Sequence, residues 1–279
     1  MCSGMIVKVA RSLWPANLKT RLGKNVVVRL GLWIALASAC TSLAFAHDIN
    51  LFPQMEDTNL QVLVKYGHPS NYSPARLSSL VDLAAYSPDG KRIDNVKDVK
   101  QDGDYLSWTV GKSVQPGTWL FATRYDSGFY VKTAEGRFVN TTKLEVPNAV
   151  NAARSFKFGK ALFAVGAAGP GFNRIVGHRL EIVPQEDPFL AKVGGDLLVK
   201  VLFEGKPLAD VGVEIGDGVT HMKEVDIPRY KTNSEGLVRV PIKGNGLRLV
   251  AVDYDVPSVT PTLASKDSYS ATLVFTLKP

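Results

Sequence analysis

Short runs of apolar residues, separated by turn signals, repeat along most of the chain after residue 59. Sequences such as Ser87–Gly90 and Ser234–Gly236 favour turns, and their spacing is typical of an all-β sandwich. The predicted strands are Leu60–Tyr66, Leu80–Tyr86, Tyr105–Val110, Thr118–Tyr125, Phe129–Thr133, Phe138–Val146, His178–Val183, Leu197–Phe203, Val211–Ile215, Leu237–Ile242, Leu247–Asp253 and Ala271–Leu277. Helix signals are scarce, and Val150–Lys160 fits either a short helix or a strand.

A polar stretch bracketed by Pro184 and Pro188 predicts a domain boundary. After it, Leu197–Phe203 is broken only by Lys200, as expected for a strand that is covered on both faces. We therefore expect an all-β fold of two β-sandwich (immunoglobulin-like) domains, residues 47–185 and 186–279.

Residues 1–46 have the pattern of a secretory signal peptide. Six basic residues and no acidic ones precede a largely apolar run, Gly31–Leu43. The sequence that follows, Ala44-Phe45-Ala46, has the small-x-small pattern that a signal peptidase accepts. We expect cleavage after Ala46 and a periplasmic protein that begins with His47. The alternative is a lipoprotein anchored at Cys40.

This cleavage would change the composition. The chain has 33 Lys and Arg against 26 Asp and Glu, but six of the basic residues lie in the leader, so the remainder is nearly neutral and nucleic acid is not an expected partner. Both cysteines, Cys2 and Cys40, also lie there, which excludes thiolate chemistry and disulfides from the processed protein. No later apolar run reaches the ~20 residues of a membrane helix, so we expect no membrane insertion after cleavage.

His47 is the first candidate metal ligand. After cleavage its imidazole and the free α-amine could close a ring around a transition metal, and both groups lose protons readily near neutral pH. Nitrogen donors suit Ni(II) and Cu(II), and Asp48 could add a further donor. Alternatively, His47 is merely the residue that follows the cleavage site.

His68 is the second candidate. It shares strand parity with Leu60, Val62, Val64 and Tyr66, a largely apolar set that predicts an inward-facing side chain. Pro69 favours an extended backbone at His68. The imidazole is either a metal ligand or a hydrogen-bonded core histidine, and His47 offers it a partner.

Two further histidines are weaker metal candidates. His178 shares parity with Leu180 and Ile182, which favours packing, and His221 lies in a polar stretch typical of a solvated loop. Residues 124–130 read as a tyrosine-rich hairpin tip that could orient a ligand histidine. No nucleophile elbow, phosphate-binding loop or zinc-protease motif is present, so we do not expect an enzyme.

Several short segments together carry a resemblance to a known family: His47–Pro53, Gly67-His68, Tyr86–Lys91, Lys160–Leu162, Leu180–Pro184, Asp187-Pro188 and Val201–Leu208. On these segments the chain resembles a family of exported proteins catalogued as domain of unknown function 4198, commonly described as periplasmic components of nickel or cobalt uptake systems. The resemblance implies a periplasmic metal-handling role with an accessory or carrier task. This chain departs from the family pattern in having no histidine between Val250 and Ser268.

The expected function is therefore a non-enzymatic periplasmic protein that binds Ni(II) or Co(II) through His47, Asp48 and His68 and assists a membrane transporter. Three alternatives stay open. One is a copper carrier with the same site, because the affinity order of divalent metals favours Cu(II) at nitrogen ligands. The others are a copper enzyme that oxidises polysaccharides through two histidines, and a structural or adhesive β-sandwich protein.

Overall fold

The computed structural model describes residues 47–69, 71–94, 96–112, 114–216 and 227–278. The signal peptide predicted over residues 1–46, with Cys2 and Cys40, lies outside the described residues, and so does His221. Within the described ranges the chain forms strands and three single-turn 3₁₀ helices, Leu77–Ser79, Val96–Asp98 and Pro188–Leu190, which confirms the all-β, sandwich-type fold.

The strands form three sheets in the described part of the chain. The first sheet has the order β1-β2-β7-β6, with β3 beside β2. Its strands are β1 (Ile49–Glu56), β2 (Asn59–His68), β3 (Asn71–Ser73), β6 (Lys100–Asp102) and β7 (Tyr105–Lys112).

The largest sheet has the order β15-β14-β17-β18-β10-β8-β4-β5, with β9 beside β8. Its strands are β4 (Leu80–Tyr86), β5 (Arg92–Asp94), β8 (Gly117–Lys132), β9 (Phe138–Val139), β10 (Asn151–Val165), β14 (Gly212–Gly216), β15 (Arg229–Lys231), β17 (Gly246–Pro257) and β18 (Lys266–Leu277). The segment left open between helix and strand, Val150–Lys160, is thus a strand from Asn151 on, as the first part of β10.

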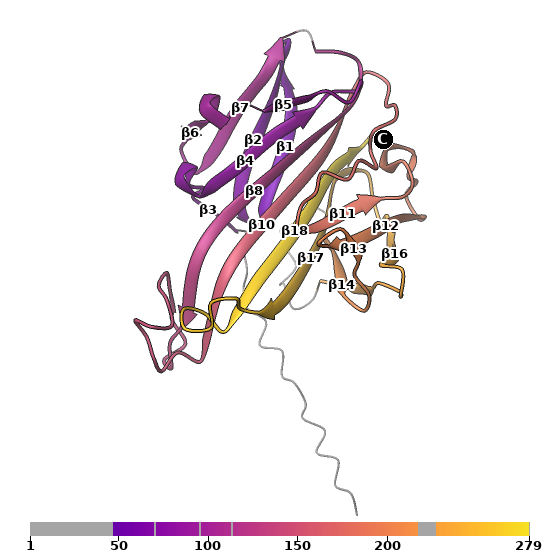
Figure 1. Cartoon of the computed structure of the whole chain (residues 1–279). Helices are drawn as coiled ribbons and strands as arrows, with labels where there is room; N and C mark the ends of the chain where they lie inside the picture. Colours follow the sequence, from indigo (N-terminus) through magenta and orange to yellow (C-terminus); the bar gives the residue numbers. More distant parts are fainter. Residues whose placement is uncertain (1–46, 70, 95, 113, 217–226, 279) are drawn as a thin grey trace, which may run out of the picture. The chain divides into compact units, whose positions relative to one another are not determined.

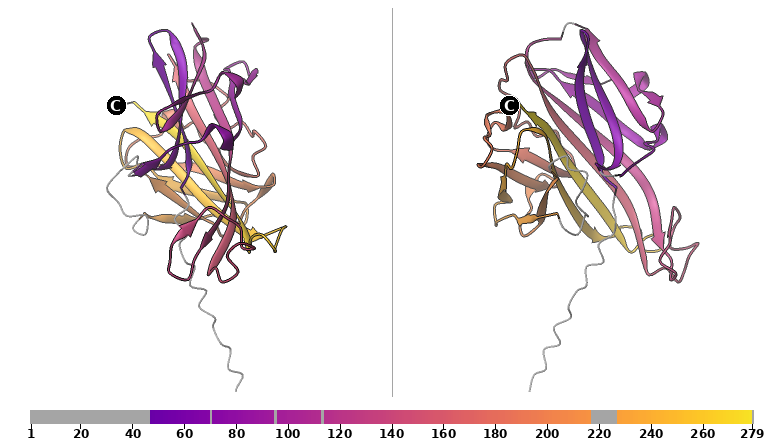
Figure 2. Two further views of the ribbon diagram at one scale, coloured as in Figure 1. Left: turned by 90° about the vertical axis from the view of Figure 1, so that its left-hand side faces the viewer. Right: turned by 180° about the vertical axis from the view of Figure 1, so that it is seen from behind.

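The third sheet contains β11 (Leu180–Pro184), β12 (Asp196–Phe203), β13 (Lys206–Pro207) and β16 (Leu237–Pro241). Figures 1 and 2 show the long strands β8, β10, β18 and β17 with the first sheet on one side and the third sheet on the other. We call the large sheet the central sheet.

Two hydrophobic cores lie on opposite faces of the central sheet. Because side chains alternate along a strand, Trp119 and Phe121 of β8 join the core under the first sheet, whereas Leu120 and Ala122 join the core under the third sheet. The same alternation divides β18, whose Val274 and Phe275 enter different cores. The central sheet therefore contributes apolar side chains to both hydrophobic cores.

The predicted boundary after residue 185 does not divide the sheets. Strand β18, near the C-terminal end, pairs in parallel with β10, and the described residues from His47 on belong to one compact unit. Each hydrophobic core also takes residues from both predicted segments. The proline-bracketed stretch is a connection between β11 and β12, which pair with each other.

The sequence Asp126-Ser127-Gly128 is not the turn of a hairpin. Strand β8 continues through it to Lys132, and the pairing with β10 shifts there, because Phe156 lies opposite Asp126 and Ser155 opposite Gly128. The Asp126 carboxylate accepts a hydrogen bond from the backbone N–H of Gly128, which has a positive φ of 78°. A β-bulge therefore forms at Ser127, and the chain turns only after residue 132.

Strand β1 crosses the central sheet at a row of small residues. Thr123, Gly159 and Thr272 lie side by side on β8, β10 and β18. A Cβ at Gly159 would lie only 3.1 Å from the carbonyl oxygen of Ile49, so the missing side chain permits this approach. The start of β1 is thereby fixed against the central sheet.

The described residues contain no helix long and apolar enough to cross a membrane.

Candidate functional site

The pairing of β1 with β2 brings the two segments of the predicted site together. Ile49 lies opposite Tyr66, and the backbone N–H of Gly67 donates to the carbonyl oxygen of Asp48 at 2.8 Å. Gly67 has a φ of 125°, and a Cβ there would come within 2.6 Å of the Asn71 carbonyl oxygen. Glycine at this position therefore lets the chain turn back into β3 directly after the strand residue His68.

His47 and His68 are neighbours. Their ring centroids lie 5.9 Å apart with the planes at 90°, and His47 also makes an edge contact with the ring of Tyr66. A metal bound to an imidazole nitrogen lies roughly 3.2 Å from the ring centroid, so two rings on one ion have centroids no more than about 6.4 Å apart. The observed separation satisfies this limit.

Asp48 lies beside the same pair. Its side chain is 9% exposed, and its Oδ2 atom is 3.9 Å from Nδ1 of His68. A carboxylate at this distance can orient the His68 ring and can contact a cation bound by it. The three residues predicted as the stronger site, His47, Asp48 and His68, are thus brought together.

The surroundings of His47 favour its neutral form. Burial lowers the pKa of His47, His68 and Lys157 lower it further, and Asp48 opposes the shift. A neutral imidazole is the form that binds a metal, so little proton displacement is needed at this residue near neutral pH.

The sequence reasoning missed Asp253, on β17. Asp253 is exposed to solvent in the structure, yet the protein atoms around it and then the carboxylate of Asp48 raise its pKa well above the ordinary value, and Lys157 opposes this shift. Asp253 lies in the stretch between Val250 and Ser268 where the resemblance led us to look for a histidine. A single aspartate in this stretch belongs to no metal-binding motif, so the sequence alone did not indicate it.

The protein offers few side chains as metal ligands at this site. Within the described ranges, no group of three or more His, Cys, Asp and Glu side chains is arranged to hold a metal ion. Any ion at the two histidines would therefore need donors besides the side chains in their present positions, such as the α-amine of His47 after cleavage, a solvent molecule or a bound ligand.

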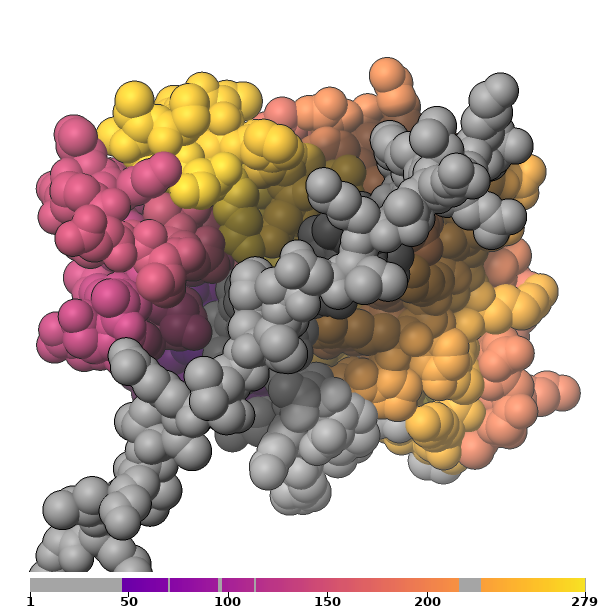
Figure 3. All heavy atoms as spheres, turned by 90° about the horizontal axis from the view of Figure 1, so that it is seen from below, coloured from indigo at the N-terminus to yellow at the C-terminus, as the bar shows by residue number. Residues whose placement is uncertain are grey.

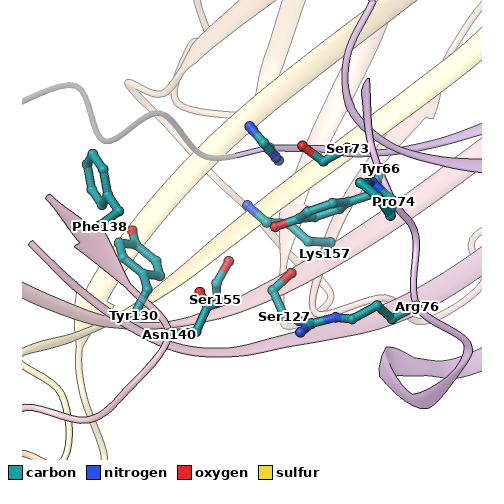
Figure 4. A pocket seen from close by; sticks show the side chains of 11 residues that line it. Tyr66, Ser73, Pro74, Arg76, Ser127, Tyr130, Phe138, Asn140, Ser155 and Lys157 are labelled. Atoms are coloured by element: carbon teal, nitrogen blue, oxygen red, sulfur yellow. The ribbon is translucent and has the colours of Figure 1, made fainter. Parts of the chain in front are cut away.

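A pocket of about 500 Å³ opens beside His47. Figure 4 shows the side chains around it, with Tyr130 and Phe138 on one side of Lys157 and Arg76 on the other. The lining residues are His47, Tyr66, Ser73, Pro74, Arg76, Ser127, Tyr130, Phe138, Asn140, Ser155 and Lys157. Ser127 is the residue of the β8 bulge, so the sequence that resembled a hairpin tip contributes to the wall of this pocket.

The chain between β8 and β10 extends the structure beyond this pocket. In Figure 3, which views the protein from below, this segment (pink) lies beside the connection from β17 to β18 (yellow). The backbone N–H of Lys143 donates to the carbonyl oxygen of Leu263 at 2.8 Å, which joins the two segments.

His178 takes no part in this site. It is buried on the opposite face of the central sheet, where its ring packs against Phe158 at 5.2 Å. Burial lowers its pKa to about 3, and the positive charges of Lys160 and Arg124 add to the effect. The packing interpretation of His178 therefore fits the structure, whereas His221 lies outside the described residues.

Beside His178, a buried ion pair orders the chain before β11. Lys160 donates to Glu181 Oε1 at 2.9 Å, and the two side chains are 2% and 1% exposed. The Glu181 carboxylate also accepts hydrogen bonds from the backbone N–H groups of Val176, Gly177 and His178. Both residues lie in segments that carried the family resemblance.

Comparisons with known proteins agree with that resemblance. The family described as Domain of unknown function (DUF4198) matches residues 44–255. An uncharacterized protein of Haemophilus influenzae is 27% identical over 206 residues, which cover 73% of this chain and 79% of that protein.

Among solved structures, a chimeric titin Z1Z2-Z1Z2 tandem functionalised with a GRGDS peptide from fibronectin covers 85% of this chain and 99% of its own. Its sequence identity of 9% and TM-score of 0.18 are too low to support a structural argument. The family match, in contrast, spans most of the chain, from before His47 to beyond Asp253. The chain belongs to the family described as Domain of unknown function (DUF4198).

Proposed function

We propose that this protein is a periplasmic, non-enzymatic carrier that binds one divalent transition-metal ion as cargo and delivers it to a membrane transporter. His47 and His68 are the proposed side-chain ligands, with Asp48 as a further donor or as the partner that orients His68. Ni(II) and Co(II) are the proposed cargo, in line with the resemblance described above.

The observation that carries the proposal is the 5.9 Å separation of the His47 and His68 rings. It lies within the geometric limit for two imidazoles on one ion. The lowered pKa of His47 supports the same use, because it favours the neutral imidazole, which is the form that binds a metal.

The proposal includes cleavage after Ala46. The new α-amine and the imidazole of His47 belong to one residue, so together they form a chelate, and His68 adds a third nitrogen. A small set of nitrogen donors suits Ni(II) and Cu(II). A site with few protein ligands also suits a carrier, because fewer bonds must break when the ion is passed on.

Copper is the second candidate cargo. Cu(II) binds nitrogen ligands more tightly than Ni(II) or Co(II) in the usual affinity order, so affinity in solution does not identify the physiological metal. Metal analysis of protein isolated from the periplasm without added metal distinguishes the candidates, because it reports which ion the cell loads.

Calorimetric titration with Ni(II), Co(II) and Cu(II) tests the site. Three proteins are needed: the form that begins with His47, the same form with His68→Ala, and a form extended by Ala46. We expect both altered forms to bind at least about tenfold more weakly, which corresponds to the loss of one ligand bond of modest strength. A His178→Gln variant is the matched control and keeps full affinity.

Mass spectrometry of the exported protein gives the second readout. An N-terminus at His47 supports the proposal, and a lipid on Cys40 or a longer N-terminus overturns the terminal chelate. Equal affinity of all three proteins would remove His47 and His68 from the metal site.

A further inference from the structure

Lys157 is a buried cation whose ammonium group has no hydrogen-bond partner among the described residues. It lies on β10 and is only 1% exposed. Strand alternation places its side chain on the same face as Ser155 and Gly159, which is the face crossed by β1. Burying an ammonium group without a hydrogen-bond partner is costly, so this missing partner needs an explanation.

The neighbouring strands do not supply that partner. Lys157 lies opposite Tyr125 of β8 on one side and opposite Ser270 of β18 on the other. Asp253 follows in the same row on β17, two strands away, at about 10 Å by the usual spacing of strands. The charge of Lys157 lowers the pKa of Asp253, but the Lys157 Nζ atom makes no hydrogen bond to it.

The pocket beside His47 contains two cationic residues and no acidic one among its lining residues. Lys157 and Arg76 provide the positive charge, and Tyr66, Tyr130 and Asn140 provide hydrogen-bonding groups. Burial, and then the nearby carboxylates of Asp255 and Asp253, raise the pKa of Tyr130 to about 12, so its hydroxyl group keeps its proton and remains a potential donor near neutral pH. The polar groups of this wall therefore suit an anion.

The size and the apolar part of the pocket indicate an organic ligand. Its volume of about 500 Å³ is within the range of small-molecule sites and far larger than a simple inorganic ion requires. The rings of Tyr130 and Phe138, 6.1 Å apart, and Pro74 offer contact surface for a carbon framework.

We propose that this pocket binds a small organic carboxylate, whose oxygens pair with the Lys157 ammonium and are reached by Arg76. Because His47 lines the same pocket, the ligand lies against the imidazole proposed to hold the metal. A contact between the carboxylate and that metal rests on the proposed function, whereas binding of the carboxylate to Lys157 does not.

Metal-free protein is used for the test, so that carboxylate binding and metal binding succeed or fail separately. Citrate and succinate are the probes in calorimetric titration, with inorganic phosphate and the uncharged polyol xylitol as comparisons. We expect saturable binding of at least one carboxylate and no comparable binding of phosphate or xylitol. Absence of carboxylate binding at about 10 mM, or equal binding of phosphate, overturns the proposal.

Variants of Lys157 then test whether the carboxylate binds in this pocket. Lys157→Met is expected to weaken carboxylate binding at least about tenfold, because a charge-assisted hydrogen bond is lost, and Lys157→Arg is expected to retain more of it. Lys231→Met, which removes a lysine with a 70% exposed side chain on the edge strand β15, is the matched control. Equal affinity of Lys157→Met and the unaltered protein contradicts the proposal.

The melting temperature of the ligand-free protein distinguishes a binding role of Lys157 from a structural one. If Lys157 awaits a ligand, Lys157→Met has an unchanged or higher melting temperature, because an unpaired buried charge is removed. A large fall in melting temperature indicates instead that Lys157 supports the fold and contradicts the proposal. Arg76→Gln, whose side chain is on the opposite part of the pocket wall, provides a second test with the same expected loss of affinity.

Discussion

Thr272 donates a hydrogen bond from its Oγ1 atom to the carbonyl oxygen of Ile49, at 2.6 Å and across 223 positions of the chain. This bond joins β18 to the start of β1, directly after His47 and Asp48. The position of the candidate site therefore depends on a strand that lies near the other end of the sequence.

Thr272→Val tests this dependence. The substitution keeps the shape of the side chain but removes the donor, and we expect a loss of about 1–2 kcal/mol in the free energy of unfolding. Metal affinity should fall as well, because the start of β1 is less firmly held. Denaturant unfolding and metal titration measure the two effects. Thr276→Val on the exposed side of the same strand is the control, with an expected change within about 0.5 kcal/mol.

Gly159→Ala tests the close approach of β1 to the central sheet. The added Cβ would lie 3.0 Å from Thr123 Cγ2 and 3.1 Å from the Ile49 carbonyl oxygen, so one of the neighbours must move. We expect a loss of about 1–3 kcal/mol in the free energy of unfolding.

The control for this substitution is Gly111→Ala on β7, where a Cβ would meet nothing within 4 Å. Thermal unfolding of both variants measures the difference. If both variants change stability equally, a general effect of alanine is responsible and the contact with Ile49 is not.

The buried pair of Lys160 and Glu181 should respond unequally to removal of its two members. Lys160→Met leaves a carboxylate that still accepts three backbone hydrogen bonds, whereas Glu181→Leu leaves an ammonium group whose remaining hydrogen bond is to the Arg174 carbonyl oxygen. Breaking a buried pair costs about 3–5 kcal/mol, and we expect Glu181→Leu to be the more destabilising change.

Denaturant unfolding at pH 7 measures this order. The exposed pair of Lys231 and Asp210 is the control, and Lys231→Met should change stability by no more than about 1 kcal/mol. The reverse order of the two buried variants would show that the ammonium group, and not the carboxylate, is the better satisfied partner.

Because His178 is buried, we expect the free energy of unfolding to fall in acid. Its pKa is about 3 in the folded protein, mainly because of burial, against an ordinary value of 6.5. Between these values the unfolded chain binds more protons than the folded one, so stability falls as the pH drops below about 6.5, by up to about 1.4 kcal/mol per pH unit. Above pH 6.5 this residue contributes no pH dependence.

Comparison of the unaltered protein with His178→Gln isolates this effect. Denaturant unfolding from pH 7 to pH 5 should show a steeper decline for the unaltered protein. Parallel curves would mean that the folded protein accommodates the charged imidazole.

The all-β class could be predicted because strand patterns depend on neighbouring residues. Leu60–Tyr66 and Leu197–Phe203 carry apolar runs that are readable within one strand, and both lie in strands of the structure. The first strand, Ile49–Glu56, was not predicted, since Pro53 weakens the pattern and its pairing with β2 is needed to fix it.

The features that could not be predicted from the sequence depend on pairing between strands that are far apart along the chain. The domain boundary was inferred from Pro184 and Pro188, but the parallel pairing of β18 with β10 joins the two segments, and nothing local indicates such a partner. Strand parity predicted only that His68 faces inward, and its nearness to His47 follows from the pairing of β1 with β2. The contributions of Lys157 and Asp253 depend on the order of strands in the central sheet.

The place of β18 in that sheet has a consequence for biosynthesis. Since β18 lies between β17 and β10, a chain that has been made only as far as residue 265 has two unpaired strand edges and both cores open. Folding must therefore wait for the last strand, and contacts of such large sequence separation form slowly. The nascent protein thus needs protection from aggregation until residues 266–277 arrive.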